Sequence, residues 1–195
     1  MADTRHELLS AAERLLLTKG LASTREIARE AGCADGTLYN HFKDRTGLYL
    51  ALLTEQVPDF AAPLRTLPYR AGEGVIADTL EEVGHAALTF YYRVAPLLGA
   101  LFAEPKLLAA YRAALRQADR GPHLSARAVE SYLRVEQRLG RVSAEANPAM
   151  AAEILFASCY RRAFGARFIG EAHTKAADRD FIRELVRSML SGLSL

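Results

Sequence analysis

The sequence predicts an all-α protein, and three observations support this expectation. Half of the 195 residues are hydrophobic and a quarter are charged, a balance typical of a chain that folds around a core. Alanine, leucine, arginine and glutamate dominate the composition, and all four favour helices. Runs of alternating Val, Ile and Thr, which would indicate strands, are absent. The length allows two helical domains, which we expect over residues 1–55 and 56–195.

The first of these domains is expected to begin with two helices. Apolar side chains recur at three- and four-residue steps over residues 3–19, and Gly20 ends that helix. Ser23, followed three residues later by Glu26, has the form of a capping box. In such a box the hydroxyl and the carboxylate each accept a hydrogen bond from an otherwise unpaired backbone N–H group. A second helix is therefore predicted over residues 24–31.

A tight turn and two further helices complete this domain. Gly32 allows the chain to reverse direction just after the second helix. A third helix is predicted over residues 35–42, with Leu38 and Phe42 one turn apart on its inward side. Asp44 is expected to cap a fourth helix that follows it directly. Four short helices on one core, with a glycine turn between the second and the third, form the layout of a helix-turn-helix.

The remaining chain is also expected to be helical. Pro58 and Pro63 are expected to interrupt or kink the fourth helix, and residues 68–74 are interpreted as a connection. Most of the later helices are predicted to begin at or near Pro or Asp, which suit a first turn whose N–H groups are unpaired. These helices are expected over residues 74–94, 96–103, 105–118, 122–139, 148–169 and 178–190.

Three segments of the first domain carry a specific resemblance. They are LSAAERL at residues 9–15, REIAREAG at residues 25–32 and GTLYNHFK at residues 36–43. Together they resemble the DNA-binding domain of TetR-family regulators. The resemblance implies a homodimer that binds double-stranded operator DNA, and a larger C-terminal domain that dimerises and binds a small-molecule ligand. It also implies a transcriptional repressor that the ligand releases from its operator.

The DNA contacts are expected mainly on the third helix. In a helix-turn-helix the second helix of the motif lies in the major groove, with its N-terminal residues at the base edges. This rule selects Ala34, Asp35, Gly36, Thr37, Tyr39 and Asn40. The resemblance implies that phosphate contacts come from Thr24, Arg25, Tyr39, His41, Lys43 and Arg45. With Leu38 and Phe42 in the core, the helical period turns the polar side chains of this helix outward.

Charge in this domain leaves two questions open. Residues 1–50 contain seven Lys or Arg and seven Asp or Glu, so a DNA-binding face must concentrate its positive charge. The zero net charge also supports an alternative, in which the helix-turn-helix binds a protein. Asp35 could accept a hydrogen bond from cytosine N4, or it could only favour the helix N-terminus by its charge. Ala34 and Asp35 also leave the third helix without a good N-cap.

The larger domain holds most of the aromatic residues, which can line a cavity or form plain core. The resemblance implies a ligand pocket among the middle helices of this domain. For this pocket we nominate Phe90, Tyr91, Phe102, Tyr111 and Tyr160. His85 and His123 are either polar groups of the pocket or structural residues.

The last two long helices are predicted to pair with their copies in a second chain. One side of the helix over residues 148–169 mixes small and large residues, which lets another helix approach closely. These residues are Ala151, Leu155, Ser158, Arg162, Gly165 and Ile169. The terminal helix adds Phe181, Leu185, Val186 and Met189. The resemblance implies a four-helix interface between two chains, and the alternative is core within one chain.

The sequence gives no sign of an active site, a metal site or a membrane segment. It lacks paired carboxylates in an apolar setting, a His-x-x-x-His pair, a nucleophile elbow and a phosphate loop. We therefore expect no catalysis, no metal and no cofactor. Cys33 and Cys159 lack disulfide or metal spacing, and no segment predicts secretion or a membrane span, so the expected location is the cytoplasm. Cys33 is interpreted as a small buried hydrophobe, with a redox sensor as the alternative.

Overall fold

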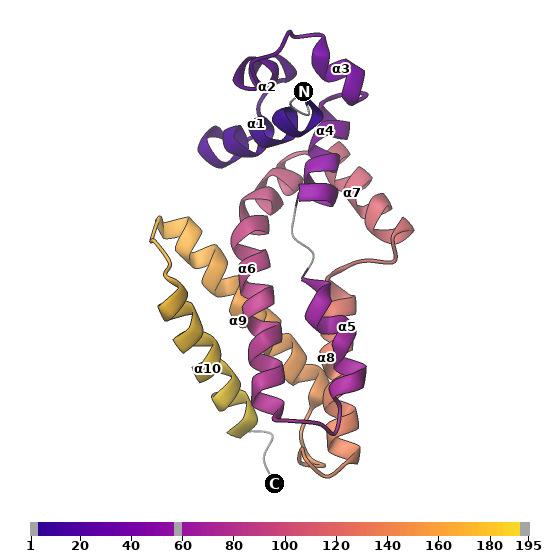
Figure 1. Ribbon diagram of the computed structural model, residues 1–195, viewed down its shortest axis with the longest axis vertical. Coiled ribbons are helices and arrows are strands. Elements are labelled where there is room, and N and C mark those ends of the chain that lie inside the picture. Colours follow the sequence, from indigo (N-terminus) through magenta and orange to yellow (C-terminus); the bar gives the residue numbers. More distant parts are fainter. Residues whose placement is uncertain (1–3, 57–59, 192–195) are drawn as a thin grey trace. The chain divides into compact units, whose positions relative to one another are not determined.

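The computed structural model describes residues 4–56 and 60–191 as helices joined by loops (Figure 1). In chain order the helices are α1 (Thr4–Lys19), α2 (Thr24–Glu30), α3 (Thr37–His41), α4 (Arg45–Ala51), the π-helical turn η1 (Leu52–Gln56), α5 (Ala61–Arg70), α6 (Ile76–Ala103), α7 (Pro105–Gln117), α8 (Pro122–Arg138), α9 (Pro148–Ile169) and α10 (Lys175–Ser191). By compactness the described residues form two units. The N-terminal unit contains residues 4–56 and 96–119, and the C-terminal unit contains residues 60–95 and 120–191.

α1 to α4 enclose one small core, as the sequence predicted. Leu8, Ile27, Leu38 and Leu48, one from each helix, are fully buried there. Gly32, in the turn between α2 and α3, has φ +70°, which lies in the left-handed region that favours glycine. α2 and α3 therefore form a helix-turn-helix. The prediction of an all-α fold with this motif at the N-terminus is confirmed.

The N-terminal unit is larger than the domain expected over residues 1–55. The end of α6 and all of α7 belong to it, and α7 packs against α4. Arg45, at the start of α4, forms an ion pair with Glu104, which directly precedes α7. Because of this packing, compactness divides the chain at three places and not at a single boundary after residue 55.

Side-chain caps fix the starts of α2 and α4. The Ser23 hydroxyl accepts a hydrogen bond from the Glu26 N–H at 3.3 Å, and the Glu26 carboxylate accepts one from the Ser23 N–H at 2.8 Å. Hydrogen bonds from Lys19 and Ser23 lower the pKa of Glu26 to about 2. Asp44 accepts a hydrogen bond from the Gly47 N–H at 2.7 Å. Both predicted caps are confirmed, and α3 lacks a side-chain cap, as expected.

The core of the C-terminal unit lies between α5, the first part of α6, α8, α9 and α10. α8 packs on both α5 and α9, and α10 lies beside α9 (Figure 1). Leu80, Val129, Leu155 and Ile182 are fully buried in this core. The larger helical region predicted for the C-terminal part of the chain is therefore confirmed.

Two helices differ from the prediction. α5 occupies residues that were expected to hold an interrupted helix followed by a connection. Pro63 is the third residue of α5, where a missing N–H has no helical partner to lose, and Pro68 lies near its last turn. α6 is one continuous helix, although two helices were expected on either side of residue 95.

α6 continues through Pro96 because α9 supplies the hydrogen bond that the proline cannot make. Proline has no N–H, so the carbonyl four residues earlier, that of Tyr92, loses its helical partner. Arg167 on α9 donates to this carbonyl from Nε at 3.3 Å and from Nη2 at 3.2 Å. The expected break was wrong because the sequence shows the proline but not the arginine that compensates for it.

α6 is long and apolar enough to cross a membrane, by length and composition alone. Its residues Leu80, Val83, Ala87 and Leu88 lie in the core of the C-terminal unit. A core helix can have the same length and hydropathy, and these residues give α6 a place in this core.

A buried ion pair holds the loop between α5 and α6. Glu136 on α8 is fully buried, and its Oε2 lies 3.2 Å from Nη1 of Arg141 in an ion pair without hydrogen-bond geometry. Its Oε1 accepts a hydrogen bond from the Gly72 N–H at 3.1 Å, and Arg141 donates to the Gly74 carbonyl at 2.6 Å. The loop that the sequence marked only as a connection is thus fastened to α8.

Candidate nucleic-acid interface and ligand groove

The outer face of α3 is polar and exposed. Leu38 and Phe42 are buried in the core of the N-terminal unit. Tyr39, Asn40 and His41 lie in solvent, and Tyr39 is 59% exposed. The other residues selected for the base edges are the exposed Ala34, Asp35 and Gly36 and the half-buried Thr37. The helical period predicted this division between inward and outward side chains.

Two of the residues nominated for phosphate contacts lie beside this face with polar groups available. Thr24, the first residue of α2, has its hydroxyl oxygen 3.5 Å from that of Tyr39, so the two helices bring these hydroxyls together. Lys43, in the loop after α3, is exposed. Hydroxyl and ammonium groups of this kind can donate hydrogen bonds to phosphate oxygens.

Both arginines nominated for phosphate contacts are paired with carboxylates. Arg25 Nε lies 3.1 Å from Asp35 Oδ2, and both side chains are mostly exposed. Arg45 is half-buried and forms its ion pair with Glu104. Arg25 would therefore have to exchange Asp35 for a phosphate, whereas Arg45 already links α4 to the start of α7.

One residue that positions α2 was not predicted. Tyr49 on α4 is buried, and its hydroxyl accepts a hydrogen bond at 2.9 Å from the N–H of Ala22, just before α2. Burial raises the pKa of the Tyr49 phenol. A tyrosine between Leu48 and Leu50, on a predicted helix, is the only sequence signal for this contact. It fixes the entry to α2 on the same core that holds α3.

The Arg25–Asp35 pair leads to a testable expectation. Asp35→Asn should strengthen binding to duplex DNA about twofold to fivefold, because Arg25 then meets phosphate without a competing carboxylate. This gain corresponds to the roughly 0.4–1 kcal/mol of an exposed ion pair. Fluorescence anisotropy at several salt concentrations measures it, and the salt slope should steepen by about one.

Arg25→Ala is the control for this experiment. If the gain acts through Arg25, Asp35→Asn adds nothing in the Arg25→Ala background. Weaker binding of Asp35→Asn to its operator, with unchanged binding to other DNA, would contradict the expectation. That result would show that Asp35 accepts a hydrogen bond from a cytosine.

The residues nominated for a ligand pocket are divided between the two units. Tyr91 on α6 and Tyr160 on α9 lie together in the C-terminal unit, with ring centroids 5.6 Å apart. The Phe90 ring lies 5.4 Å from that of Tyr91. Phe102 and Tyr111 belong to the N-terminal unit, and Phe102 is 71% exposed. The structure thus groups three of the five nominated residues.

A groove of about 370 Å³ opens beside Tyr91 and Tyr160. It is lined from α6, α8 and α9 by Tyr91, Pro122, His123, Ala126, Glu153, Phe156, Ala157 and Tyr160. His123 therefore borders the groove, and His85 is not among these lining residues. Burial raises the pKa of Tyr91 to about 12, with smaller contributions from Cys159 and Glu153. This groove is the candidate ligand site.

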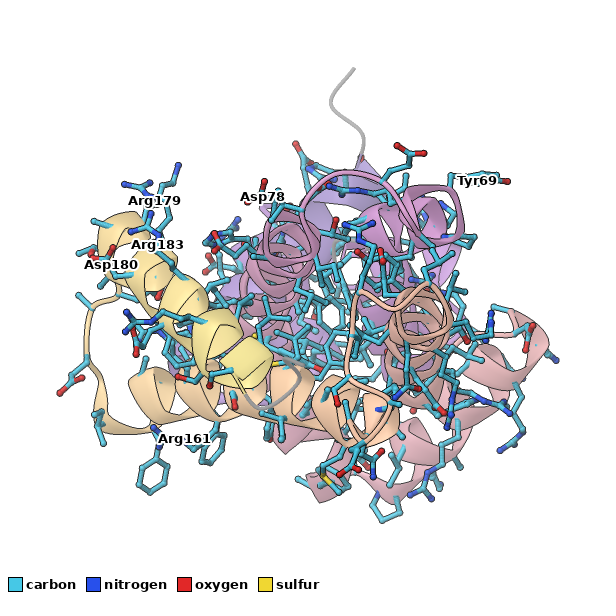
Figure 2. All side chains as sticks on the ribbon, turned by 90° about the horizontal axis from the view of Figure 1, so that it is seen from below. Tyr69, Asp78, Arg161, Arg179, Asp180 and Arg183 are labelled. Carbon is cyan, nitrogen blue, oxygen red and sulfur yellow. The ribbon has the colours of Figure 1, made fainter. Side chains whose placement is uncertain are left out.

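The two sides of α9 are arranged differently from the prediction. Ala151 and Leu155, expected on the pairing side, are buried in the core of their own chain, because small and large residues in alternation also suit core packing. The apolar side that remains exposed carries Met150, Ile154, Phe164 and Phe168. Figure 2 shows Arg179, Asp180 and Arg183 pointing outward from α10. The exposed side of α9 thus carries four large apolar side chains together with the exposed Arg161, whereas the outward side of α10 that Figure 2 shows is charged.

The cysteines are packed side chains within the described residues. Cys33 is half-buried and Cys159 is buried, and both are free thiols. Their sulfurs lie 3.5 Å from the Ala28 carbonyl and 3.7 Å from the Gly84 carbonyl. Burial raises the pKa of the Cys159 thiol to about 12, which keeps it protonated. Over residues 4–56 and 60–191, no cluster of three His, Cys, Asp or Glu side chains could hold a metal ion.

Residues 8–52 match the family model described as bacterial regulatory proteins, tetR family. The matched segment begins in α1, ends at the start of η1 and contains the whole helix-turn-helix. A search of curated proteins finds no match. The resemblance of the N-terminal residues to this family is confirmed.

Solved structures of bacterial regulators share the fold of the whole chain. A regulatory protein of the tetR family from Rhodococcus RHA1 has a TM-score of 0.68 and 17% identity, covering 100% of this chain and 98% of its own. NalD from Pseudomonas aeruginosa, the secondary repressor of the MexAB-OprM multidrug efflux pump, has a TM-score of 0.69 and 20% identity over 100% and 98%. FadR from Bacillus subtilis, solved in complex with stearoyl-CoA, has a TM-score of 0.66 and 15% identity over 96% and 98%. The chain has the fold of TetR-family transcriptional regulators.

Proposed function

We propose that this protein is a transcriptional repressor that binds operator DNA as a homodimer and is released by a small molecule. The observation that carries the proposal is the exposed polar face of α3. This face lies beside a capped α2, in the segment that matches the tetR family model. α3 would read bases in the major groove, and α2 with the loop after α3 would hold the phosphates.

The distribution of charge supports DNA as the partner. The first 50 residues have no net charge, but Arg25 and Lys43 are exposed beside the face of α3. Lys43 would place its positive charge where phosphate would lie, and Arg25 would add its own once it exchanges Asp35 for a phosphate. Hydroxyl and cationic groups around an exposed helix face are the groups that contact phosphate oxygens in DNA complexes.

The exposed apolar side of α9 supports the homodimer. Met150, Ile154, Phe164 and Phe168 recur at helical spacing and are each at least 43% exposed in the single chain. Exposed apolar side chains grouped along one side of a helix are typical of protein interfaces, and the exposed Arg161 lies among them. A second copy would cover this stripe and place two recognition helices on one operator.

The groove beside Tyr91 supports control by a small molecule. Its volume, about 370 Å³, falls in the range of ligand sites. FadR, which shares the fold, was solved with stearoyl-CoA bound. A ligand releases DNA only if it binds more tightly to a conformation of the protein that does not bind DNA. Operator DNA must then weaken ligand binding by the same free energy by which the ligand weakens operator binding, about 1–3 kcal/mol.

A gel-shift experiment with genomic fragments that flank the gene tests the proposal. Retention of one or a few fragments in excess competitor DNA is the expected result. Binding that is equally strong for every fragment, or absent for all of them, would contradict operator recognition. If no fragment binds, a helix-turn-helix that binds a protein becomes the better account of the same fold.

A further inference from the structure

The groove between α6, α8 and α9 has an aromatic wall. Tyr91 and Tyr160 form an edge-to-face pair at 5.6 Å, with an interplanar angle of 77°. Phe156 also lines the groove, and the ring of Phe60 packs behind it at 6.0 Å. Burial raises the pKa of the Tyr91 phenol from 10.0 to about 12, and the phenol is neutral near pH 7 at either value. This wall therefore offers π-electron density and a hydroxyl group, but no charge.

A carboxylate lies at the same groove. Glu153 on α9 is exposed, and it stands one helical turn before Ala157 and two turns before Tyr160. Its negative charge is among the causes that raise the pKa of Tyr91, so it acts at the aromatic wall. Among the described residues that line the groove there is no Lys or Arg.

The N-terminus of α8 also borders the groove, and its partial positive charge opposes the negative charge of Glu153. A helix N-terminus carries about half of a positive elementary charge, spread over its unpaired N–H groups. Pro122 occupies the first position of α8 and has no N–H to contribute. Among the described residues that line the groove, Glu153 is the one Asp, Glu, Lys or Arg, so it supplies a full negative charge beside the aromatic wall.

We propose that this groove binds an organic cation, a quaternary or protonated amine with an apolar body. The carboxylate and the electron-rich ring faces both attract such a head group, and Phe156 and Ala126 provide apolar surface for the body. This inference rests on the proposed function, since it names the class of molecule that would control operator binding.

The test uses calorimetry on the full-length protein with three probes of equal chain length, each below its micelle concentration. These probes are decyltrimethylammonium, decanol and decanoate. We expect the cation to bind at least about tenfold more tightly than decanol or decanoate, because both the carboxylate and the ring faces attract its head group. Glu153→Gln should weaken cation binding about fivefold and leave decanol binding unchanged.

Two further variants separate the local site from general charge. Glu145→Gln removes the same charge from an exposed residue in the loop before α9, which does not line the groove, and should leave binding unchanged. Tyr160→Leu keeps an apolar side chain but removes a ring, and should weaken cation binding about as much as Glu153→Gln.

Equal or tighter binding of decanoate or decanol would overturn the inference, as would cation binding that is insensitive to Glu153→Gln. Failure of the cation to bind at all would also overturn it. A parallel gel shift keeps the proposed function distinct from this inference. Operator binding that another compound releases would preserve the proposed function, whereas cation binding without operator release would preserve the site but refute ligand control by it.

Discussion

Glu136→Ala is expected to lower the free energy of unfolding by about 3–5 kcal/mol, the cost of breaking a buried ion pair from one side. Glu136 is fully buried between Arg141 and the Gly72 N–H group. Its removal leaves the Gly72 N–H without an acceptor and the Arg141 guanidinium without its counter-charge, while Arg141 keeps its hydrogen bond to the Gly74 carbonyl. The same loss should lower the melting temperature by about 6–20 °C. Chemical denaturation and thermal melting, both followed by circular dichroism, measure the effect.

Glu130→Ala is the matched control on the same helix. Glu130 pairs with Arg134 at 2.8 Å, one turn away on the surface of α8. An exposed pair of this kind contributes about 0.2–1 kcal/mol, so the control should change stability little. Equal effects of the two substitutions would show that Glu136 contributes no more than a surface carboxylate and that the loop between α5 and α6 does not depend on it.

Tyr39→Ala should weaken operator binding by about 5-fold to 150-fold, which corresponds to the roughly 1–3 kcal/mol of one good contact. Tyr39 is 59% exposed at the centre of the α3 face, so its removal should leave the melting temperature almost unchanged. Because the phenol is neutral, the salt dependence of binding should stay the same. Fluorescence anisotropy with labelled operator at several salt concentrations measures both quantities.

Lys43→Ala gives the contrasting result in the same assay. It removes a positive charge from the loop after α3, so the salt slope should fall by about one, with a similar loss of affinity for every DNA sequence.

Tyr69→Ala is the control for Tyr39→Ala, because it also removes an exposed aromatic ring: Tyr69 is 85% exposed on α5 (Figure 2). A collapse of stability in Tyr39→Ala would place this residue in the core instead of at the DNA.

The sequence was most informative where structure depends on neighbouring residues. The capping box of Ser23 and Glu26, the cap at Asp44 and the glycine turn at Gly32 each act within a few residues. The inward and outward sides of α3 follow from the helical period alone. These local rules were sufficient to predict the helix-turn-helix and the exposed face of its second helix.

Contacts between distant residues could not be predicted in this way. Pro96 fits inside α6 only because Arg167, on another helix, donates to the Tyr92 carbonyl. The partners Glu136 and Gly72 are separated by 64 positions. No local pattern links such residues, so the continuous α6 and the fastened loop were missed. The aromatic nominations are divided between the two units, because composition does not show which helices pack together.

A hydroxyl-radical footprint of the retained genomic fragment tests the proposed function most directly. The fragment should contain a palindrome with two protected half-sites about 34–36 Å apart, or a multiple of that spacing, because a twofold dimer presents two recognition helices. Phe168→Glu, which places a charge on the exposed side of α9, should abolish this footprint at concentrations where Tyr69→Glu still gives it. Protection of a single asymmetric site, unchanged by Phe168→Glu, would contradict operator binding by a homodimer.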